Sequence, residues 1–261
     1  MIRDFRDKVC VVTGAASGIG AALARALDAE GATLVLVDRD PRVVDHARRY
    51  RHASGHELDV ADAAAWTRLA GEVGAASVLV NNAGISVAGR FDEIPADVFD
   101  RLFAVNFGGV VHGCRAFMPL LRAQQEAHVV NVCSSFAWLG FPGKSAYAAS
   151  KAAVRAFSES LRAELSETGV GVTLLFPGPV DTDLVRKGHA VDPAQREREA
   201  AFLAGRAIPA ERVAARCLAG IRKNHARVLV GVDYRALDLL VRCSPVGAAA
   251  VVTALSKRMP F

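Results

Sequence analysis

The sequence predicts an α/β fold built on a doubly wound parallel sheet of about seven strands, with helices on both faces. Short apolar runs alternate along the chain with helical stretches rich in alanine, leucine and charge. These runs are continuously apolar, which is typical of strands buried on both faces of a parallel sheet. A glycine-rich turn from Gly14 to Gly20 separates the first run from a helical pattern, as in the first βαβ unit of doubly wound sheets.

The expected elements follow in order. The first strand, 9–12, leads through the glycine turn into a helix over 19–29, where apolar residues recur at helical spacing until Gly31 ends it. The second strand covers 33–37. Further strand-like runs lie at 77–80, 128–132, 170–176 and 227–230. Residues 1–261 are expected to form one domain, because single α/β domains commonly reach this length.

Two segments depart from the alternation of strands and helices. Residues 181–206 are charged and follow the run at 170–176, where ligands bind in such sheets, so they are interpreted as a lid. Residues 234–261 form an apolar extension with a basic end, too short in its apolar part to span a bilayer. We expect this extension to pack against the pocket or another subunit; peripheral contact with a lipid surface is the alternative.

Composition narrows the classes of function. The formal net charge is +5, but the basic residues are dispersed, so nucleic acid is not an expected partner. The five cysteines lack Cys-x-x-Cys spacing, and His46, His52 and His56 lack the spacing of a helical zinc pair, so no metal is expected. No apolar stretch is long enough for a transmembrane segment and no signal-peptide core precedes the first strand, which predicts a cytoplasmic protein.

The glycine-rich turn predicts a dinucleotide site. Backbone N–H groups and the positive end of the following helix would face a pyrophosphate, and glycines permit its close approach. Asp38 ends the second strand, where a carboxylate can accept from both hydroxyls of an adenosine ribose and repels a 2′-phosphate. NAD is therefore favoured over NADP. Arg39 could still receive a phosphate, and Asp38 could instead serve as a turn or cap residue.

Tyr147 and Lys151 predict an acid/base pair. Residues at i and i+4 share one face of a helix, so the ammonium would lie beside the phenol. An adjacent cation is expected to lower the phenol pKa from its usual value near ~10. An isolated pair of this kind is more often a solvated surface pair, so its meaning depends on the other motifs. Ser134, just after the run at 128–132, can donate a hydrogen bond to a substrate oxygen.

Together these motifs resemble the short-chain dehydrogenase/reductase family in its classical single-domain form. The resemblance covers about residues 8–232 and is carried by Thr13-Gly-x-x-x-Gly-x-Gly20, Asn81-Asn82-Ala83-Gly84, Asn106, Ser134, Tyr147-x-x-x-Lys151 and Pro177-Gly178. It implies a Rossmann-type fold and an NAD(P)-dependent oxidoreductase that acts on a secondary alcohol or ketone. It also implies a homodimer or homotetramer.

The resemblance implies a role for each site residue. The catalytic set would be Asn106, Ser134, Tyr147 and Lys151, with Lys151 also bonding the nicotinamide ribose and Asn106 holding a water that connects Lys151 to solvent. A helix-bending core asparagine is the alternative for Asn106. The family spacing selects Ser134 rather than Ser135, and Cys133 is interpreted as a buried thiol.

The expected cofactor contacts extend along the carboxyl edge of the sheet. The resemblance assigns Asp59 to the adenine, Asn82 to the turn that supports the cofactor and Thr182 to the nicotinamide amide. The full expected set is Gly14, Ser17, Gly18, Ile19, Gly20, Asp38, Arg39, Asp59, Val60, Asn82, Ala83, Gly84, Tyr147, Lys151, Pro177, Gly178, Val180 and Thr182.

The substrate is expected to be apolar. Residues after the catalytic serine and in the lid commonly line the cleft in this family, and here they include Phe136, Trp138, Leu139, Phe141, Leu184 and Phe202. Such a lining favours a steroid, terpenoid, fatty-acyl or aromatic alcohol or ketone, although several of these side chains could pack the core instead. The alternative function is a non-catalytic, nucleotide-sensing interaction protein, against which the complete set of four catalytic residues argues.

Overall fold

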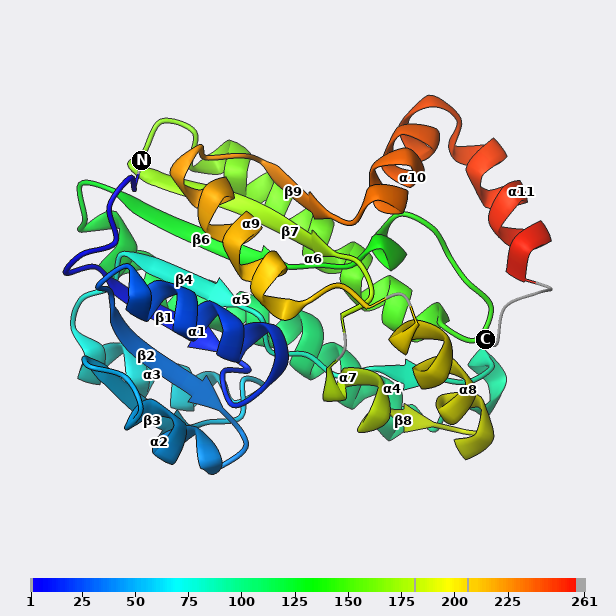
Figure 1. Ribbon diagram of the computed structural model, residues 1–261, viewed down its shortest axis with the longest axis horizontal. Coiled ribbons are helices and arrows are strands. Elements are labelled where there is room, and N and C mark those ends of the chain that lie inside the picture. The colour runs from blue at the N-terminus through cyan, green and yellow to red at the C-terminus, as the bar shows by residue number, and fades with distance from the viewer. Residues whose placement is uncertain (1, 181, 206, 257–261) are drawn as a thin grey trace.

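Strands and helices alternate along the chain in a computed structural model, which describes residues 2–180, 182–205 and 207–256; the side chains at 202–204, 232–237 and 255–256 lie outside the description. Figure 1 shows their arrangement in space. The strands are β1 Val9–Thr13, β2 Thr33–Asp38, β3 Ala53–Glu57, β4 Val78–Asn81, β5 Val87–Ala88, β6 Ala127–Val132, β7 Val170–Pro177, β8 His189–Ala190 and β9 Arg227–Val230. The helices are α1 Gly18–Ala29, α2 Arg42–Ala47, α3 Ala63–Val73, α4 Ala96–Phe103, α5 Gly109–Arg122, α6 Ser145–Glu164, α7 Asp183–Arg186, α8 Pro193–Ala204, α9 Ala210–Arg222, α10 Val232–Cys243 and α11 Pro245–Ser256, with short helical turns η1 Phe91–Glu93, η2 Ala104–Gly108 and η3 Ser135–Ala137.

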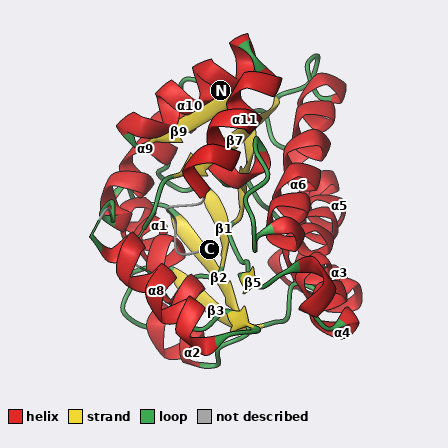
Figure 2. Cartoon of the chain, turned by 90° about the vertical axis from the view of Figure 1, so that its right-hand side faces the viewer, coloured by secondary structure: helices red, strands yellow, loops and turns green. Residues whose placement is uncertain are grey.

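Seven strands of the described chain form one parallel sheet in the order β3-β2-β1-β4-β6-β7-β9. The chain starts in the middle of the sheet, winds outward to β3 and then returns past β1 to build the other half. Helices lie on both faces, with α1 and α9 on one side and α3, α5 and α6 on the other (Figure 2). The doubly wound fold is therefore confirmed, and all six apolar runs of the sequence are strands in it.

Each face of the sheet carries its own hydrophobic core. Successive side chains of a strand point to opposite faces, so Cys10 and Val12 of β1 join the core under α1 and α9, whereas Val11 joins the core under α3 and α5. Trp66 and Phe117 meet edge to face in the second core with ring centroids 5.8 Å apart. Burial on both faces explains why the central strands have no polar alternation.

The edge strand β3 was not predicted. Its sequence, Ala-Ser-Gly-His-Glu, is polar and half-exposed, so it carries none of the apolar signal of the central strands. Gly55 lets α2 lie directly on it, since a Cβ there would be 2.6 Å from the Val43 carbonyl oxygen. His56 lies in this edge strand. In the part of the chain that is described, no three His, Cys, Asp or Glu side chains are grouped as a metal site.

The segment predicted as a lid folds as α7, β8 and α8; its end residues 181 and 206 lie outside the description. Strand β8 pairs in parallel with β5, with Val87 opposite His189 and Ala88 opposite Ala190. These two short strands were also not predicted, because two residues are too few for a periodic signal. Their pairing fixes the segment after β7 to the segment after β4.

The C-terminal segment folds as two helices, α10 and α11, which contact each other beyond the end of the sheet (Figure 1). Ala248 and Val252 on α11 are buried against Leu139, whereas Val246 of the same helix is 83% exposed. One side of α11 therefore packs against the loop that follows β6, whereas packing against the pocket or another subunit stays a prediction; residues 257–261 of the predicted extension lie outside the description. Within the described residues, no helix is both long and apolar enough to cross a membrane.

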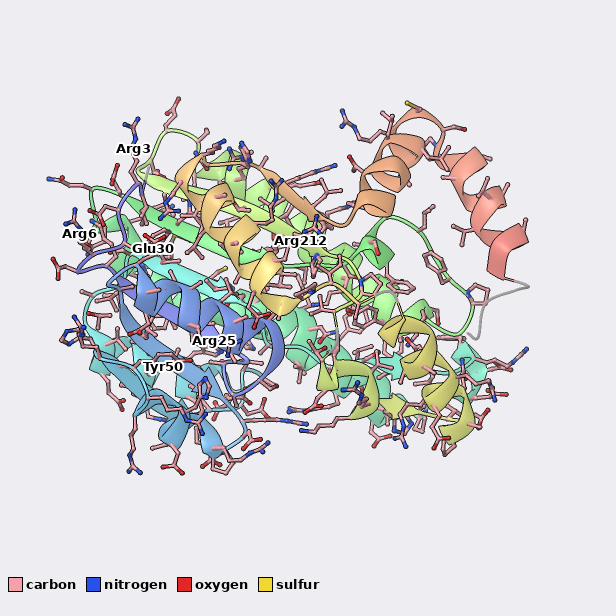
Figure 3. The ribbon with its side chains drawn as sticks, viewed as in Figure 1. Arg3, Arg6, Arg25, Glu30, Tyr50 and Arg212 are labelled. Carbon is pink, nitrogen blue, oxygen red and sulfur yellow. The ribbon has the colours of Figure 1, made fainter. Side chains whose placement is uncertain are left out.

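Many basic side chains are separated from one another and paired with acids. Figure 3 places Arg3, Arg6 and Arg25 at different points of one face. Arg6 contacts Asp4 at 2.5 Å, and Arg25 contacts Glu211 at 2.7 Å. Such exposed pairs contribute little to stability, but each balances the charge of its arginine locally.

Candidate functional site

The turn between β1 and α1 can be built only with glycine at three positions. Gly14 and Gly18 have φ angles of 65° and 55°, in the left-handed region. At Gly20, a Cβ would lie 2.1 Å from the Gly14 carbonyl oxygen, so the helix could not start so close to the strand with any side chain there. The result is a tight turn in which the first N–H groups of α1 face the carboxyl edge of the sheet.

Thr13 and Asn82 fasten the glycine turn to the next strand of the sheet. The Thr13 hydroxyl accepts from the backbone N–H groups of Asn82 and Ala83 at 2.8 and 2.9 Å and lies 3.3 Å from the Val80 carbonyl oxygen, to which it can donate. The Asn82 amide donates in return to the Thr13 carbonyl at 2.8 Å. Asn82 thus holds the two loops in register, in keeping with its expected position beneath the turn.

Asp38 lies at the end of β2 and is half-buried beside the glycine turn. One carboxylate oxygen accepts from the Ala16 N–H at 3.0 Å, and the other accepts from the Asp40 N–H at 3.0 Å. These bonds fulfil the cap role that the sequence left open. They also fix the carboxylate at the rim of the cavity, beside Arg39.

Helix α6 presents Tyr147 and Lys151 on one face, as the spacing predicted. Both side chains are buried, with 7% and 4% of their surface exposed. The Lys151 ammonium lies 6.0 Å from the Tyr147 ring centroid and donates to the Val132 carbonyl at 3.1 Å. The Ser134 hydroxyl, at the end of β6, is a hydrogen-bond partner of the Tyr147 phenol.

Burial reverses the expected direction of the Tyr147 pKa. Burial raises the pKa of this phenol well above its usual range, and the hydrogen bond with Ser134 offsets the rise only in part. Burial also lowers the pKa of Lys151. The prediction that Lys151 depresses the tyrosine pKa is therefore wrong in this structure, because desolvation outweighs the attraction of a cation that is directed at a backbone carbonyl. At neutral pH the phenol is protonated.

Asn106 lies in η2, a π-helical turn that joins α4 to α5, and is fully buried. Its side chain accepts from the Ile85 N–H at 2.8 Å and donates to the Ile85 carbonyl and the Ser150 hydroxyl, both at 3.1 Å. Gly84 leaves room above it: a Cβ at Gly84 would be 3.1 Å from the Asn106 oxygen and 3.5 Å from the Lys151 ammonium. Asn106 therefore ties the loop after β4 to the helix that carries Tyr147 and Lys151.

One cavity of about 310 Å³ joins the glycine turn to the residues of α6. Most residues expected at the site line it: Gly14, Ser17, Gly18, Ile19, Asp38, Arg39, Asn82, Ala83, Gly84, Ser134, Tyr147, Lys151, Pro177, Gly178, Val180 and Thr182. Thr182 meets the glycine turn directly, since a Cβ at Gly18 would be 2.8 Å from its methyl carbon. Residues from six separate stretches of chain thus converge at the carboxyl edge of the sheet, as the motifs predicted.

Four expected residues lie outside this lining within the described chain: Gly20, Asp59, Val60 and Asn106. Gly20 lies beneath the turn, and Asn106 lies behind Lys151. The Asp59 carboxylate accepts from the Ala61 N–H at 3.0 Å and contacts Arg101 at 2.5 Å. The Val60 carbonyl accepts from the Trp66 indole at 3.0 Å. The contacts of Asp59 and Val60 are thus directed at the protein; the assignment of Asp59 to the adenine and of Val60 to the cofactor site stays a prediction.

Only part of the expected apolar lining reaches the cavity. Phe136 and Leu184 line it. Leu139 is buried against α11, with Trp138 and Phe141 packed on the same cluster, and Trp138 also stacks on Phe176 with centroids 4.6 Å apart. Trp138, Leu139 and Phe141 are therefore packing residues, which is the alternative that the sequence left open; the Phe202 side chain lies outside the description.

Sequence reasoning missed a charged pair in the cavity wall. Lys144, just before α6, and Glu199 of α8 both line the cavity, and their side chains are 2% and 4% exposed. The ammonium nitrogen lies 2.6 Å from a carboxylate oxygen of Glu199 and 3.5 Å from the Ser86 hydroxyl, to which it can donate. No local pattern could reveal this pair, because its members come from separate elements and only the folded lid brings them together.

Fold and site together define a Rossmann-type dinucleotide-binding class: a doubly wound sheet with a glycine turn after its first strand and a buried Ser–Tyr–Lys group at its carboxyl edge. The family model described as short chain dehydrogenase matches residues 8–191. The chain therefore belongs to the short-chain dehydrogenase family, as the resemblance predicted.

Two relatives from Mycobacterium tuberculosis illustrate the match. The chain is 38% identical over 251 residues to a putative oxidoreductase, SadH, and the match covers 91% of both proteins. It is 46% identical over 191 residues to a probable oxidoreductase, EphD, in a match that covers 69% of this chain and 32% of EphD. The match thus spans about a third of the length of EphD.

Solved structures show the same fold. A short-chain dehydrogenase from Streptomyces avermitilis has a TM-score of 0.81 at 31% identity, with 98% of both chains covered. A family member from Burkholderia phymatum, solved in complex with NAD, has a TM-score of 0.80 at 30% identity, covering 93% of this chain and 96% of that chain. One from Burkholderia cenocepacia, solved in complex with NADP, has a TM-score of 0.81 at 25% identity, covering 95% and 98%.

Proposed function

We propose that this protein is an NAD(P)-dependent oxidoreductase that interconverts a secondary alcohol and a ketone. The observation that carries the proposal is the convergence of Ser134, Tyr147 and Lys151 with the glycine turn in one cavity. The names of SadH and EphD as oxidoreductases support the same class of activity. A nucleotide sensor would require the turn and Asp38, but it would not require a buried phenol, serine and ammonium beside them.

The residues present fit a nicotinamide dinucleotide. Gly14, Gly18 and Gly20 leave no side chain over the backbone N–H groups at the start of α1, and these groups with the helix dipole favour a pyrophosphate. Asp38 at the rim would accept from the ribose hydroxyls and disfavour a 2′-phosphate, so we propose NAD as the preferred form. Relatives are solved with either NAD or NADP, and Arg39 beside Asp38 is the group that would favour NADP.

The bound dinucleotide supplies the chemistry of accepting or donating a hydride. In the direction of reduction, Tyr147 donates its phenolic proton to the substrate oxygen as the carbonyl carbon gains the hydride, so that ketone, hydride and proton yield one alcohol. The raised pKa keeps that proton on Tyr147 until the substrate is in place. Ser134 donates a hydrogen bond to the same oxygen and stabilises the charge that develops on it.

Lys151 and Asn106 support Tyr147 from behind. We propose that the Lys151 ammonium, buried at hydrogen-bond distance from the Val132 carbonyl, also donates to the nicotinamide ribose and favours the phenolate once the proton has left. Asn106 holds the loop at Ile85 and, through Ser150, the helix that carries the pair, and a water at this point would connect Lys151 to solvent. These roles belong to the proposal.

The substrate has an apolar body. Phe136 of η3 and Leu184 of α7 line the cavity and support a hydrophobic alcohol or ketone. We propose a homodimer or homotetramer in the cytoplasm, with the dimer formed through the helices that carry Asn106 and Tyr147, as the family resemblance implies.

The test is a screen of secondary alcohols with NAD, and separately with NADP, that records the absorbance of the reduced cofactor. Oxidation of at least one alcohol, lost in Tyr147→Phe, supports the proposal. A purified protein that binds the dinucleotide but transfers no hydride across a panel of steroid, terpenoid, fatty and aromatic alcohols would support the nucleotide-sensing alternative.

A further inference from the structure

The buried pair Lys144–Glu199 lies in the wall of the same cavity as Tyr147. Lys144 precedes Tyr147 at the start of α6, and Glu199 comes from the lid helix α8. The charge of Glu199 raises the pKa of the Tyr147 phenol further, and the phenol shares this cavity with the pair. A substrate held by Ser134 and Tyr147 would therefore extend toward it.

Stability alone does not account for this pair. Removing two charges from water costs free energy that their mutual attraction rarely offsets in full. Well-packed apolar residues of similar volume commonly stabilise such a contact equally well or better. The lid is already attached to the loop after β4 by the pairing of β5 with β8. A charged pair at this position thus indicates a binding role, because buried polar groups in a cavity wall fix the orientation of a ligand.

The pair offers a hydrogen-bond donor to a neutral acceptor. An ammonium has three N–H donors, and among the described residues Lys144 has two polar neighbours, the Glu199 carboxylate in an ion pair at 2.6 Å and the Ser86 hydroxyl at 3.5 Å. Glu199 balances the charge, so an incoming carboxylate would have to compete with it at close range and meet its repulsion. An uncharged oxygen, such as a hydroxyl, carbonyl or ether, can accept the third N–H without disturbing the pair.

We propose that Lys144, held by Glu199, determines specificity by binding a second, uncharged oxygen of the substrate. The inference rests on the proposed function and deepens it: the substrate is an alcohol or ketone with an apolar body and a further neutral oxygen acceptor, rather than a plain hydrocarbon ketone or an oxo acid.

The test compares ketones that differ only by one oxygen. The probes are 4-methoxycyclohexanone against 4-ethylcyclohexanone, and 2-methoxycyclohexanone against 2-ethylcyclohexanone, because each pair replaces an ether oxygen by a methylene at nearly constant shape. Their dissociation constants are measured by titration calorimetry on the protein with oxidised NAD, from which no hydride can pass to a ketone. The oxygen-bearing member of at least one pair should bind about tenfold more tightly, the effect of one hydrogen bond to a charged donor.

Variants separate recognition from lid attachment. Lys144→Met should reduce the preference for the ether to less than about twofold, the value left when the charged donor is gone. Lys144→Met combined with Glu199→Leu should do the same, and it avoids a carboxylate buried without its partner. Arg198→Met is the matched control, because it removes an exposed cation from α8, the helix that carries Glu199. Arg198 contacts Asp192 at 3.3 Å, and the variant should keep the preference for the ether.

Two results would overturn the inference. The first is that the wild-type protein shows no preference for the ether in either pair, which includes the case in which the ethers do not bind. The second is a preference for the ether that survives in the double variant. The latter would make Lys144–Glu199 a lid contact only. Because the titration involves no hydride transfer, a protein that binds the ethers as expected and reduces no ketone would refute the proposed activity and leave the inference standing.

Discussion

Ser134 and Ser135 are adjacent, both are buried and both line the cavity, but it is the Ser134 side chain that interacts with the Tyr147 phenol. We therefore expect Ser134→Ala to lower kcat by about 10²-fold or more, the effect of losing one donor to a developing oxyanion. Ser135→Ala should change kcat much less and serves as the matched control. Steady-state kinetics on both variants provide the measurement, and the opposite ranking would place the catalytic serine one residue later.

Tyr147→Phe removes the proton donor and keeps the ring. Turnover should fall by at least about 10²-fold, as for other lost general acids, while NAD affinity measured by titration stays near that of the wild type. The ring should still meet Phe136 edge to face, as it does at 5.9 Å between centroids, so the fold is preserved. Near-normal turnover in a folded Tyr147→Phe protein would refute the proposed mechanism.

Asp38→Ser should shift the cofactor preference from NAD toward NADP. The change removes the carboxylate that repels a 2′-phosphate and leaves Arg39 free to pair with it. The ratio of kcat/KM for the two cofactors is the measurement. Asp38→Asn is the informative companion, because it keeps an acceptor for the Ala16 N–H and separates loss of charge from loss of the cap bond. A wild-type protein that prefers NADP would show that Arg39 sets the choice.

The sequence predicted residue identities better than their electrostatics. The glycines, Tyr147 and Lys151 could be predicted because they satisfy local constraints of the turn and the helix face, whereas Asn82 and the choice of Ser134 over Ser135 came from the family resemblance. The direction of the Tyr147 pKa could not, because it depends on how completely the packed fold removes the phenol from water. Lys144 and Glu199 escaped prediction for a related reason, since their partnership exists only after the lid helix docks.

At the scale of elements, buried strands were predictable and short or polar ones were not. A continuous apolar run such as residues 34–37 of β2, all of them buried, can be recognised from the sequence. The edge strand β3 does not, and neither do the two-residue strands β5 and β8, whose pairing depends on long-range contact. The lid was predicted from its position after β7, but its division into α7, β8 and α8 was not.

Helix α11 provides a prediction at this scale. Deleting the chain after Ser244 removes Ala248 and Val252, which cover Leu139 beside the loop that carries Phe136. We expect NAD affinity to persist and the KM for apolar substrates to rise, or the oligomeric mass to change, because apolar surface becomes exposed. Enzyme kinetics, NAD titration and light scattering are the measurements.

Two single variants test the packing of α11 more specifically than the truncation does. Val252→Ser replaces a buried side chain and should reproduce part of the effect, whereas Val246→Ser alters an exposed one and should not. If truncation leaves NAD affinity, KM and mass unchanged while binding to liposomes disappears, α11 acts at a lipid surface instead.

At the scale of the whole molecule, the topology of the parallel sheet determines where the site lies. Parallel strands bring every carboxyl end to one edge, so motifs dispersed from Gly14 to Thr182 gather in a single cavity. This geometry made the location of the site predictable from the order of elements alone. The substrate preference of the site cannot be predicted from the order of elements, because the positions of the lid and of the helices after β9 depend on contacts particular to this chain.

The distribution of the cysteines has a practical consequence. Cys10, Cys114, Cys133 and Cys217 are buried, and burial raises the pKa of each thiol, whereas Cys243 is exposed at the end of α10. Since the thiolate is the species that reacts with maleimides, labelling should stop at one dye per chain without any mutagenesis. That dye would stand at the joint between α10 and α11, so the native protein already carries a unique attachment point for fluorescence or spin probes that follow this joint while ligands bind.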